Sequence, residues 1–475
     1  MTFLPFSVTL IKMAAGIPGI FSAYGDVMKK NKQQIKLSDH FTYGRLLKFT
    51  LPSILMMIFT SIYGVVDGFF VSNYAGKTAF TAVNFIFPLL MILGAIGFMF
   101  GTGGSALVAR TLGEKDAEKA NRTFSLLVYV SLALGILVAA VSILLLRPIV
   151  RWMGAEGELL ENCVLYGRII LCALPAFVLQ MEFQSFFVTA EKPKLGLAVT
   201  LASGVTNMVL DAVLVGIFRQ GLVGAALATG LSQVVGGVIP LLYFGRKNSS
   251  LLRLTKTRFD KQALWKTCTN GSSELMSNVS MSLVSMLYNI QLLSMAGQDG
   301  VSAYGTMMYV NMIFLAIFIG YSIGTSPVIG FHLGSENYEE LKSLLRKSGV
   351  IIGICSVSML GLGLALAKPL SVLFVGYDPA LCQLTIHGFY IFAVSFLFVG
   401  FAIFFSGFFT ALNDGITSAI ISFLRTLVFQ IAAVLLLPLI WGIDGIWWSI
   451  VVAELMAMVV GMIFLVLKRK QFHYF

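Results

Sequence analysis

Twelve long runs of apolar residues occupy most of this chain. Each can cross a membrane as a helix, because an α-helix rises 1.5 Å per residue and about 20 residues span the roughly 30 Å of bilayer hydrocarbon. Barrel strands would instead appear as alternating segments of about ten residues. The sequence therefore predicts an all-α integral membrane protein with 12 transmembrane helices, at 46–73, 79–110, 122–150, 161–190, 195–218, 221–245, 267–295, 300–331, 345–374, 384–411, 414–440 and 443–467.

Lys and Arg are unequally distributed between the connections of these helices. If the amino-terminal segment is placed in the cytoplasm, the connections on that side hold 25 of these residues and those on the opposite side hold six. The positive-inside rule then predicts a multi-pass protein of the plasma (inner) membrane with both termini in the cytoplasm. The formal net charge of +11 records this topology. Because no soluble domain carries a basic face, we expect no nucleic-acid partner.

An internal repeat relates the two halves of the chain at an offset of 221 residues. Its matches fall at helix ends and turns, as in Gly76 with Gly297 and Gly113 with Gly334. Each half holds six helices, an even number, so the repeats are parallel and related by an axis along the membrane normal. The sequence thus predicts two six-helix bundles around a central cleft, an arrangement typical of transporters.

The repeat also sets the expected domain boundaries. They are a cytoplasmic N-terminal segment (1–45), an N-lobe (46–245), a cytoplasmic linker (246–266), a C-lobe (267–467) and a cytoplasmic tail (468–475). Residues 1–27 lack the basic leading region of a signal sequence, and the stretch MKKNKQQIKLSDH looks like an ordinary cytoplasmic start. We therefore expect translation to begin at Met28.

Three polar residues lie at one depth in the first bundle, on three different helices. Asp67, Asp211 and Thr229 are each roughly 9 to 12 Å from the outer end of their helix, and Asn207 lies one turn deeper on the face of Asp211. An ionisable residue inside a span costs about 2.5 to 3.5 kcal/mol on insertion scales and marks a functional site by default. These oxygen atoms can bind a hard cation such as Na⁺, or the two acids can share one proton. The alternative is that both acids only hydrogen-bond neighbouring helices.

Four stretches together resemble the multidrug and toxic compound extrusion (MATE) family of cation-coupled exporters. They are VVDGFFVSNYAG, GTGGSALVARTLGEKDAEKA, AEKPKLGLAVTLASGVTNMVLD and GLVGAALAT, and the resemblance extends over 40–467. It implies that Asp67, Asn207, Asp211 and Thr229 form the family's amino-terminal-lobe cation site. It also implies an antiporter that exports small organic, often cationic, compounds in exchange for H⁺ or Na⁺ by alternating access. We expect no cofactor, membrane lipid as the surroundings, and a monomer.

The second bundle departs from the pattern of the family. Some members carry acids there, but the span 384–411 contains none, and the repeat mates of Asp67 and Asp211 are Tyr288 and Ala432. We therefore expect cation coupling in the N-lobe alone.

Another pair of charged residues lies near the midplane of the second bundle. Arg425 and Glu454 are each roughly 16 Å from an end of their helix. A buried charge without a partner is strongly destabilising, so we predict that they form an intramembrane ion pair. The pair either locks adjacent helices or acts in gating or substrate contact.

Other polar and soft side chains are candidates for lining the substrate cleft. Glu182 and Glu274, one in each lobe, lie about two turns from the cytoplasmic surface, where they form either an acidic access route for cationic drugs or solvated groups of a vestibule. The remaining candidates come from four different helices, and they are Met56, Gln180, Asn289 and Asn311.

Two other functions compete with drug export. One is a flippase for a lipid-linked precursor, which would need a large cationic cavity for a pyrophosphate headgroup, and the other is an exporter of one specific metabolite. An enzyme would need a catalytic cluster, and the sequence shows none. The five cysteines form no pair of ligand spacing, so we expect no metal beyond Na⁺ at the coupling site.

Overall fold

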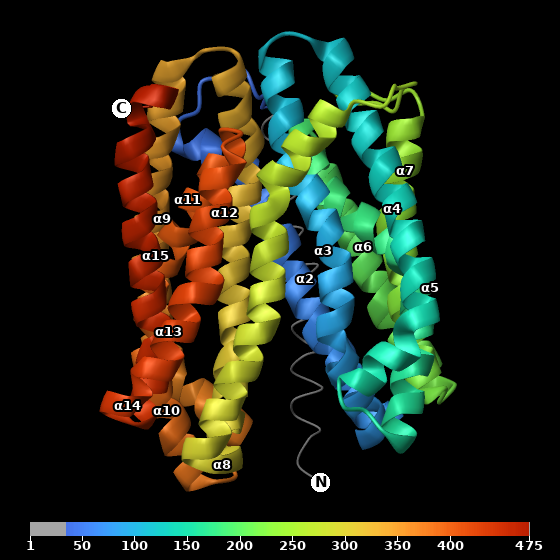
Figure 1. Ribbon diagram of the computed structural model, residues 1–475, viewed down its shortest axis with the longest axis vertical. Helices are drawn as coiled ribbons and strands as arrows, with labels where there is room; N and C mark the ends of the chain where they lie inside the picture. The colour runs from blue at the N-terminus through green and yellow to red at the C-terminus, as the bar shows by residue number, and fades with distance from the viewer. Residues whose placement is uncertain (1–34, 475) are drawn as a thin grey trace.

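The computed structural model describes residues 35–474 (Figure 1). The expected translation start at Met28 lies outside these described residues. The first bundle, the N-lobe, contains α2 (Tyr43–Phe70), α3 (Lys77–Gly113), α4 (Ala117–Trp152), α5 (Gly157–Thr189), α6 (Pro193–Leu210) and α7 (Gly221–Gly245). Two π-helical segments, η1 (Val71–Ala75) and η2 (Asp211–Ile217), continue α2 and α6.

The second bundle, the C-lobe, stands beside the first (Figure 1). It contains α8 (Lys261–Gly334), α9 (Tyr338–Val375), α10 (Pro379–Ala393), α11 (Phe396–Ala411), α12 (Gly415–Phe423), the π-helical η3 (Leu424–Val428), α13 (Phe429–Leu436), α14 (Pro438–Trp441) and α15 (Ile443–Phe472).

The described residues contain the 12 predicted spans. Ten helical stretches are long and apolar enough to cross a membrane, and the bent pair α10 and α11 makes an eleventh. The twelfth arises because α8 holds two predicted spans, which meet at Gly297, where φ is 62° and ψ is −149°. The break therefore falls between the predicted spans 267–295 and 300–331.

Two predicted spans are less regular than the sequence indicates. The span 384–411 is bent by 48° between α10 and α11. Around the bend, the N–H groups of Val394, Ser395 and Leu397 donate to carbonyls three residues back, as in a tighter 3₁₀ turn. The span 414–440 is interrupted by η3, which widens the helix locally.

The repeat is visible in the backbone conformation. Gly76 and Gly297 both have positive φ, as do Gly221 and Gly442. Each pair is separated by the offset of 221 residues. Positive φ is readily adopted by glycine because it lacks a Cβ, so corresponding turns of the two lobes require glycine for the same reason.

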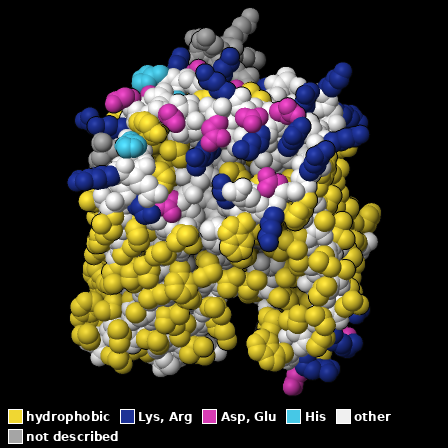
Figure 2. Space-filling model, turned by 45° about the horizontal axis from the view of Figure 1, so that its top comes forward, with side chains coloured by type: hydrophobic (Ala, Val, Ile, Leu, Met, Phe, Trp, Pro, Cys, Tyr) yellow, Lys and Arg dark blue, Asp and Glu magenta, His cyan; other side chains and the backbone are white. Residues whose placement is uncertain are grey.

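The two ends of the molecule differ in polarity and shape (Figure 2). Charged side chains gather at the end that carries the α3–α4 and α7–α8 connections and the C-terminus, here called the charged end. A broad belt of hydrophobic side chains follows. At the opposite end, the open end, a notch separates the two lobes.

Backbone contacts join the lobes at the charged end. Gly113 of α3 lies against the carbonyl of Phe331, and Gly334 of α8 lies against the carbonyl of Arg110, with no room for a Cβ at either glycine. Gly113 and Gly334 are repeat mates, and so are Arg110 and Phe331. The two contacts are therefore the same contact made twice across a pseudo-two-fold axis.

Candidate functional site

The four residues of the expected cation site lie on three neighbouring helices of the N-lobe. Asp67 is on α2, Asn207 is on α6 and Thr229 is on α7, while Asp211 is the first residue of η2. A π-helical segment adds a residue to the turn, and such segments are rare and frequent at functional sites. The carboxyl group of Asp211 is placed by this irregular turn.

A hydrogen-bonded chain runs through the hydroxyl group of Thr229. Its Oγ1 donates to Oδ1 of Asp67 over 3.3 Å and accepts from Nδ2 of Asn207 over 3.5 Å. The carboxyl groups of Asp67 and Asp211 lie within hydrogen-bonding reach of each other. The structure thus brings all four side chains together.

The site has a buried part and an accessible part. Asp211 and Asn207 are 0% and 1% exposed, whereas Asp67 and Thr229 are half-buried. Both carboxyl oxygens of Asp211 and the amide oxygen of Asn207 have no hydrogen-bond partner among the described residues. A buried carboxylate without a donor or a counter-ion is costly, so this arrangement is suited to receive a proton or a small cation.

Two tyrosines that are not predicted from the sequence border the site. The side chain of Tyr166, on α5, interacts with that of Thr229, and the side chain of Tyr63, on α2, interacts with that of Gln180. Tyr63 precedes Asp67 by four residues and so lies on the same helix face. That spacing could have identified Tyr63, but nothing in the sequence around Tyr166 points to the site.

Gln180 and Met56 lie inside the N-lobe, only 4% and 1% exposed. Nε2 of Gln180 donates to Oγ of Ser203 over 3.4 Å, and Ser203 in turn donates to the carbonyl of Ser232 over 2.7 Å. Neither candidate lines an open cleft in this conformation. Gln180 instead connects α5 to α6 and α7 next to the cation site.

The glutamates proposed for an access route lie in different surroundings. Glu182 is 0% exposed, and one of its carboxyl oxygens accepts a hydrogen bond from Ser131 while the other has no partner among the described residues. In this conformation Glu182 is not a solvated vestibule group, because it is packed against Gly101 of α3 and bonded to Ser131 of α4. Glu274 is half-buried and interacts electrostatically with Arg425.

The remaining cleft candidates are on α8. Asn289 is exposed, and Asn311 is half-buried with its Nδ2 at 3.8 Å from Sδ of Met308. Neither makes a contact that identifies it as part of a binding site.

Arg425 and Glu454, whose depths predict an ion pair, lie in contact. Nε of Arg425 donates to Oε2 of Glu454 over 2.8 Å, with side chains 15% and 7% exposed. The pair joins η3 to α15. Both charges are largely removed from solvent, so Glu454 depends on Arg425 for compensation, whereas Arg425 is compensated by Glu454 and also interacts with Glu274.

The C-lobe has a different polar group where the N-lobe has Asp67. The hydroxyl of Tyr288 donates to Oε1 of Gln430 over 2.7 Å, and its ring stacks on that of Tyr304 at 5.3 Å between centroids. Tyr288 is 1% exposed. The repeat mate of an acid is thus a buried, fully bonded phenol.

Residues 35–42, here called the strap, connect the two lobes at the charged end. The N–H of Leu37 donates to Oε1 of Glu191 in the N-lobe over 2.6 Å, and the N–H of Phe41 donates to Oε1 of Glu340 in the C-lobe over 2.9 Å. His40 contacts the second oxygen of Glu340 over 2.5 Å. Burial raises the pKa of Glu191, and the hydrogen bond from Leu37 opposes this shift.

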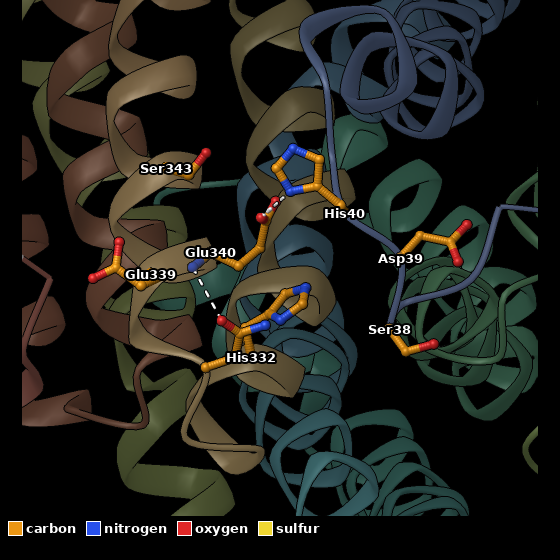
Figure 3. Close-up of a pocket in the computed structure, with 8 residues that line it drawn as sticks. Ser38, Asp39, His40, His332, Glu339, Glu340 and Ser343 are labelled. Carbon is orange, nitrogen blue, oxygen red and sulfur yellow. Dashed lines mark hydrogen bonds and ion pairs between the residues drawn. The ribbon is translucent and has the colours of Figure 1, made fainter.

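A cavity of about 500 Å³ lies beside the strap (Figure 3). It is lined by Ser38, Asp39, His40, His332, Asn337, Glu339, Glu340 and Ser343. No group of three or more His, Cys, Asp or Glu side chains within residues 35–474 is arranged to hold a metal ion. The imidazole of His332 is only 2% exposed and packs edge-on against Phe41.

Similar proteins include multidrug exporters of staphylococci. The chain is 25% identical over 429 residues to the multidrug export protein MepA of Staphylococcus haemolyticus (strain JCSC1435), covering 90% of this chain and 93% of that protein. It is also 25% identical over 446 residues to MepA of Staphylococcus saprophyticus subsp. saprophyticus, covering 93% and 97%.

Solved structures of transporters share the fold. An outward-facing multidrug resistance MATE family transporter of the MOP superfamily superposes with a TM-score of 0.87 at 22% identity, covering 94% of this chain and all of that one. A MOP superfamily transporter from Pyrococcus furiosus, described as having a binding pocket of reverse polarity that suggests a different function, has a TM-score of 0.85 at 23% identity, covering 91% and 97%.

Two stretches of the chain, residues 52–213 and 275–436, match the MatE family. They lie in the two lobes and follow the predicted duplication. Together they cover more than half of the chain. With the two-lobed fold and the duplicated match, the chain belongs to the MatE family.

Proposed function

We propose that this protein is a secondary active antiporter that exports small organic cations across the plasma membrane in exchange for a cation bound at Asp67 and Asp211. The observation that carries the proposal is the buried carboxyl group of Asp211, which has no donor among the described residues and lies against a second acid. The multidrug export activity named for relatives of similar length supports the choice of cargo.

The charged end faces the cytoplasm in this proposal. Its concentration of Lys and Arg supports this orientation by the positive-inside rule. The start of the described residues and the C-terminus then lie inside. The open end then faces outward, so the structure corresponds to an outward-open state. The lobes extend over 46–245 and 267–467, with the linker 246–266 on the cytoplasmic side.

A proton is the coupling ion that the site favours. Two carboxyl groups in hydrogen-bonding reach of each other cannot both be ionised without strong repulsion, and one shared proton gives Asp211 a hydrogen bond with Asp67. Na⁺ is the second candidate, because the unpartnered amide oxygen of Asn207 and the hydroxyl of Thr229 add oxygen ligands beside the carboxyl groups.

Transport then follows from different cation affinities in two states of the lobes. Binding of the cation from outside neutralises the pair of acids and changes the packing of α2 against α6 and α7, which favours release of the drug. The lobes next separate at the charged end, where Gly113 and Gly334 make the closing contacts. A cation can drive this change only by binding one state more tightly than the other.

The ion pair of Arg425 and Glu454 argues against a flippase for a lipid-linked precursor. Arg425 is the single basic residue deep in a predicted span, and Glu454 compensates its charge. A pyrophosphate headgroup would therefore find no uncompensated cation there. An exporter of one specific metabolite remains the alternative that transport assays must separate from drug export.

Reconstituted vesicles test the proposal. Ethidium efflux would be measured with a proton gradient alone and with a Na⁺ gradient alone, for the wild type, for Asp211→Asn and for Glu158→Gln, an exposed acid of the N-lobe. We expect the proton gradient to drive efflux in the wild type and in Glu158→Gln but not in Asp211→Asn. Efflux driven by Na⁺ alone would name the other ion, and coupled efflux by Asp211→Asn would refute the site.

A further inference from the structure

A basic strip connects the two lobes at the charged end. Residues 246–266 contain seven Lys and Arg residues against a single acid, Asp260. All seven side chains are exposed, and none forms an ion pair with a described residue. The strip therefore presents uncompensated positive charge.

Hydrogen bonds hold the strip in place on the start of α4. The N–H of Arg253 donates to Oδ1 of Asn121 over 2.7 Å, and the N–H of Thr255 donates to Oγ of Ser125 over 2.8 Å. The side chain of Leu252, next to Arg253, is 0% exposed and belongs to the N-lobe core. The strip is thus a preformed surface whose charged side chains extend from an anchored backbone.

The anchoring residues also fix the height of the strip relative to the membrane. Asn121 and Ser125 flank the start of the span expected at 122–150, so the strip lies where hydrocarbon gives way to headgroups. Phe259 and Trp265 are 76% and 72% exposed. Exposed aromatic rings beside basic residues are typical of the membrane–water interface.

We propose that residues 246–266 bind the anionic headgroups of phospholipids in the adjacent leaflet. Arg253, Lys256 and Arg258 supply the attraction, because basic segments close to a membrane surface are drawn to anionic lipid within a Debye length. Trp265 and Phe259 insert at the headgroup level. This inference concerns lipid and does not depend on the exported compound or on the coupling ion.

Trp265 provides a probe at the proposed surface. The Trp265 fluorescence is obtained as the difference between the wild type and Trp265→Phe, in vesicles of fixed anionic lipid content. We expect brominated phosphatidylglycerol to quench this fluorescence about twofold more than brominated phosphatidylcholine does at equal mole fraction. The excess should disappear in Arg253→Gln/Lys256→Gln/Arg258→Gln. It should persist in the matched control Lys194→Gln/Lys342→Gln/Arg346→Gln, which removes three exposed charges elsewhere at the charged end.

Three results would overturn the inference. The first is equal quenching of the wild type by both lipids. The second is stronger quenching by brominated phosphatidylglycerol that persists in the triple variant of the strip. The third is that inorganic phosphate, at constant ionic strength, abolishes the stronger quenching by brominated phosphatidylglycerol, which would identify a site for free anions. Unchanged quenching of the triple variant by brominated phosphatidylcholine shows that Trp265 still lies at the membrane, so misfolding would not pass for loss of lipid binding.

Discussion

The N-lobe and the C-lobe share a backbone plan but differ in how their buried polar groups are satisfied. In the N-lobe, Asp211 is fully buried with no donor among the described residues. In the C-lobe, Tyr288 is bonded to Gln430, and Arg425 is paired with Glu454. A buried acid without a donor can be stabilised by a bound proton or cation, whereas a satisfied polar network rigidifies the helices that it joins. This difference supports our proposal that ion binding takes place in the N-lobe and that Tyr288, Gln430, Arg425 and Glu454 have a structural task in the C-lobe.

The largest effect is expected from removing the charge of the N-lobe site. Asp211→Asn should lower gradient-driven efflux by on the order of 100-fold, because an amide cannot take up and release a proton. Tyr288→Phe, at the repeat position of Asp67 in the C-lobe, should leave coupling intact. Both are measured as initial efflux rates at equal amounts of reconstituted protein. Loss of coupling in Tyr288→Phe would break the division of tasks between the lobes.

The ion pair of the C-lobe is expected to act on stability. Arg425→Met should destabilise the protein by about 3 kcal/mol, since it leaves the buried Glu454 uncompensated. Glu454→Gln should destabilise it by somewhat less, because Glu274 still interacts with Arg425. The double variant should lose less than either single variant. Thermal unfolding midpoints in one detergent measure these differences. Strictly additive losses would show that the two charges do not stabilise each other.

The glycine contacts between the lobes should control closure of the charged end. Gly334→Leu is expected to destabilise the closed arrangement of the charged end by about 2 kcal/mol, because the leucine side chain would overlap the backbone at Arg110. Spin labels at positions 194 and 342 should then report a longer distance than in the wild type. Gly349→Leu, where a Cβ meets open space, serves as the control. An unchanged distance in Gly334→Leu would exclude this contact as the closing point.

The smallest effect is expected at the strap. Glu340→Ala removes the acceptor for the N–H of Phe41 and the contact with His40, which should cost about 1 kcal/mol. A spin label at position 38 should become more mobile. Glu339→Ala, the exposed neighbour of Glu340, should change neither stability nor mobility. Equal behaviour of the two variants would show that Glu340 does not hold the strap.

Much of the fold follows from sequence because hydrophobic length and glycine position are local signals. The repeat pairs Gly297 with Gly76, at a turn between two spans, and so predicts the break of α8 from the residues themselves. The bend at 394–395 carries no proline or glycine, so nothing in the sequence marks it. The π-helical segments likewise have no compositional signature, and only the backbone hydrogen bonds of the structure reveal them.

The cation site is accessible to sequence reasoning because acids are rare in spans and depth can be counted. Depth alone groups Asp67, Asp211 and Thr229. The burial of Glu182 is not accessible in this way, since depth along a helix does not tell which face a neighbouring helix covers. The bonds from the strap to Glu340 join residues about 300 positions apart, and no local pattern reports such contacts.

The reciprocal glycine contacts have a consequence for how the two halves can change. An isologous contact of this kind, between two copies of one chain, would force the same sequence to serve both sides. Here a single polypeptide carries both copies, so a substitution at Gly113 leaves Gly334 untouched. A gene that encodes both halves in tandem can thus keep the shared contact surface while each half acquires its own buried chemistry.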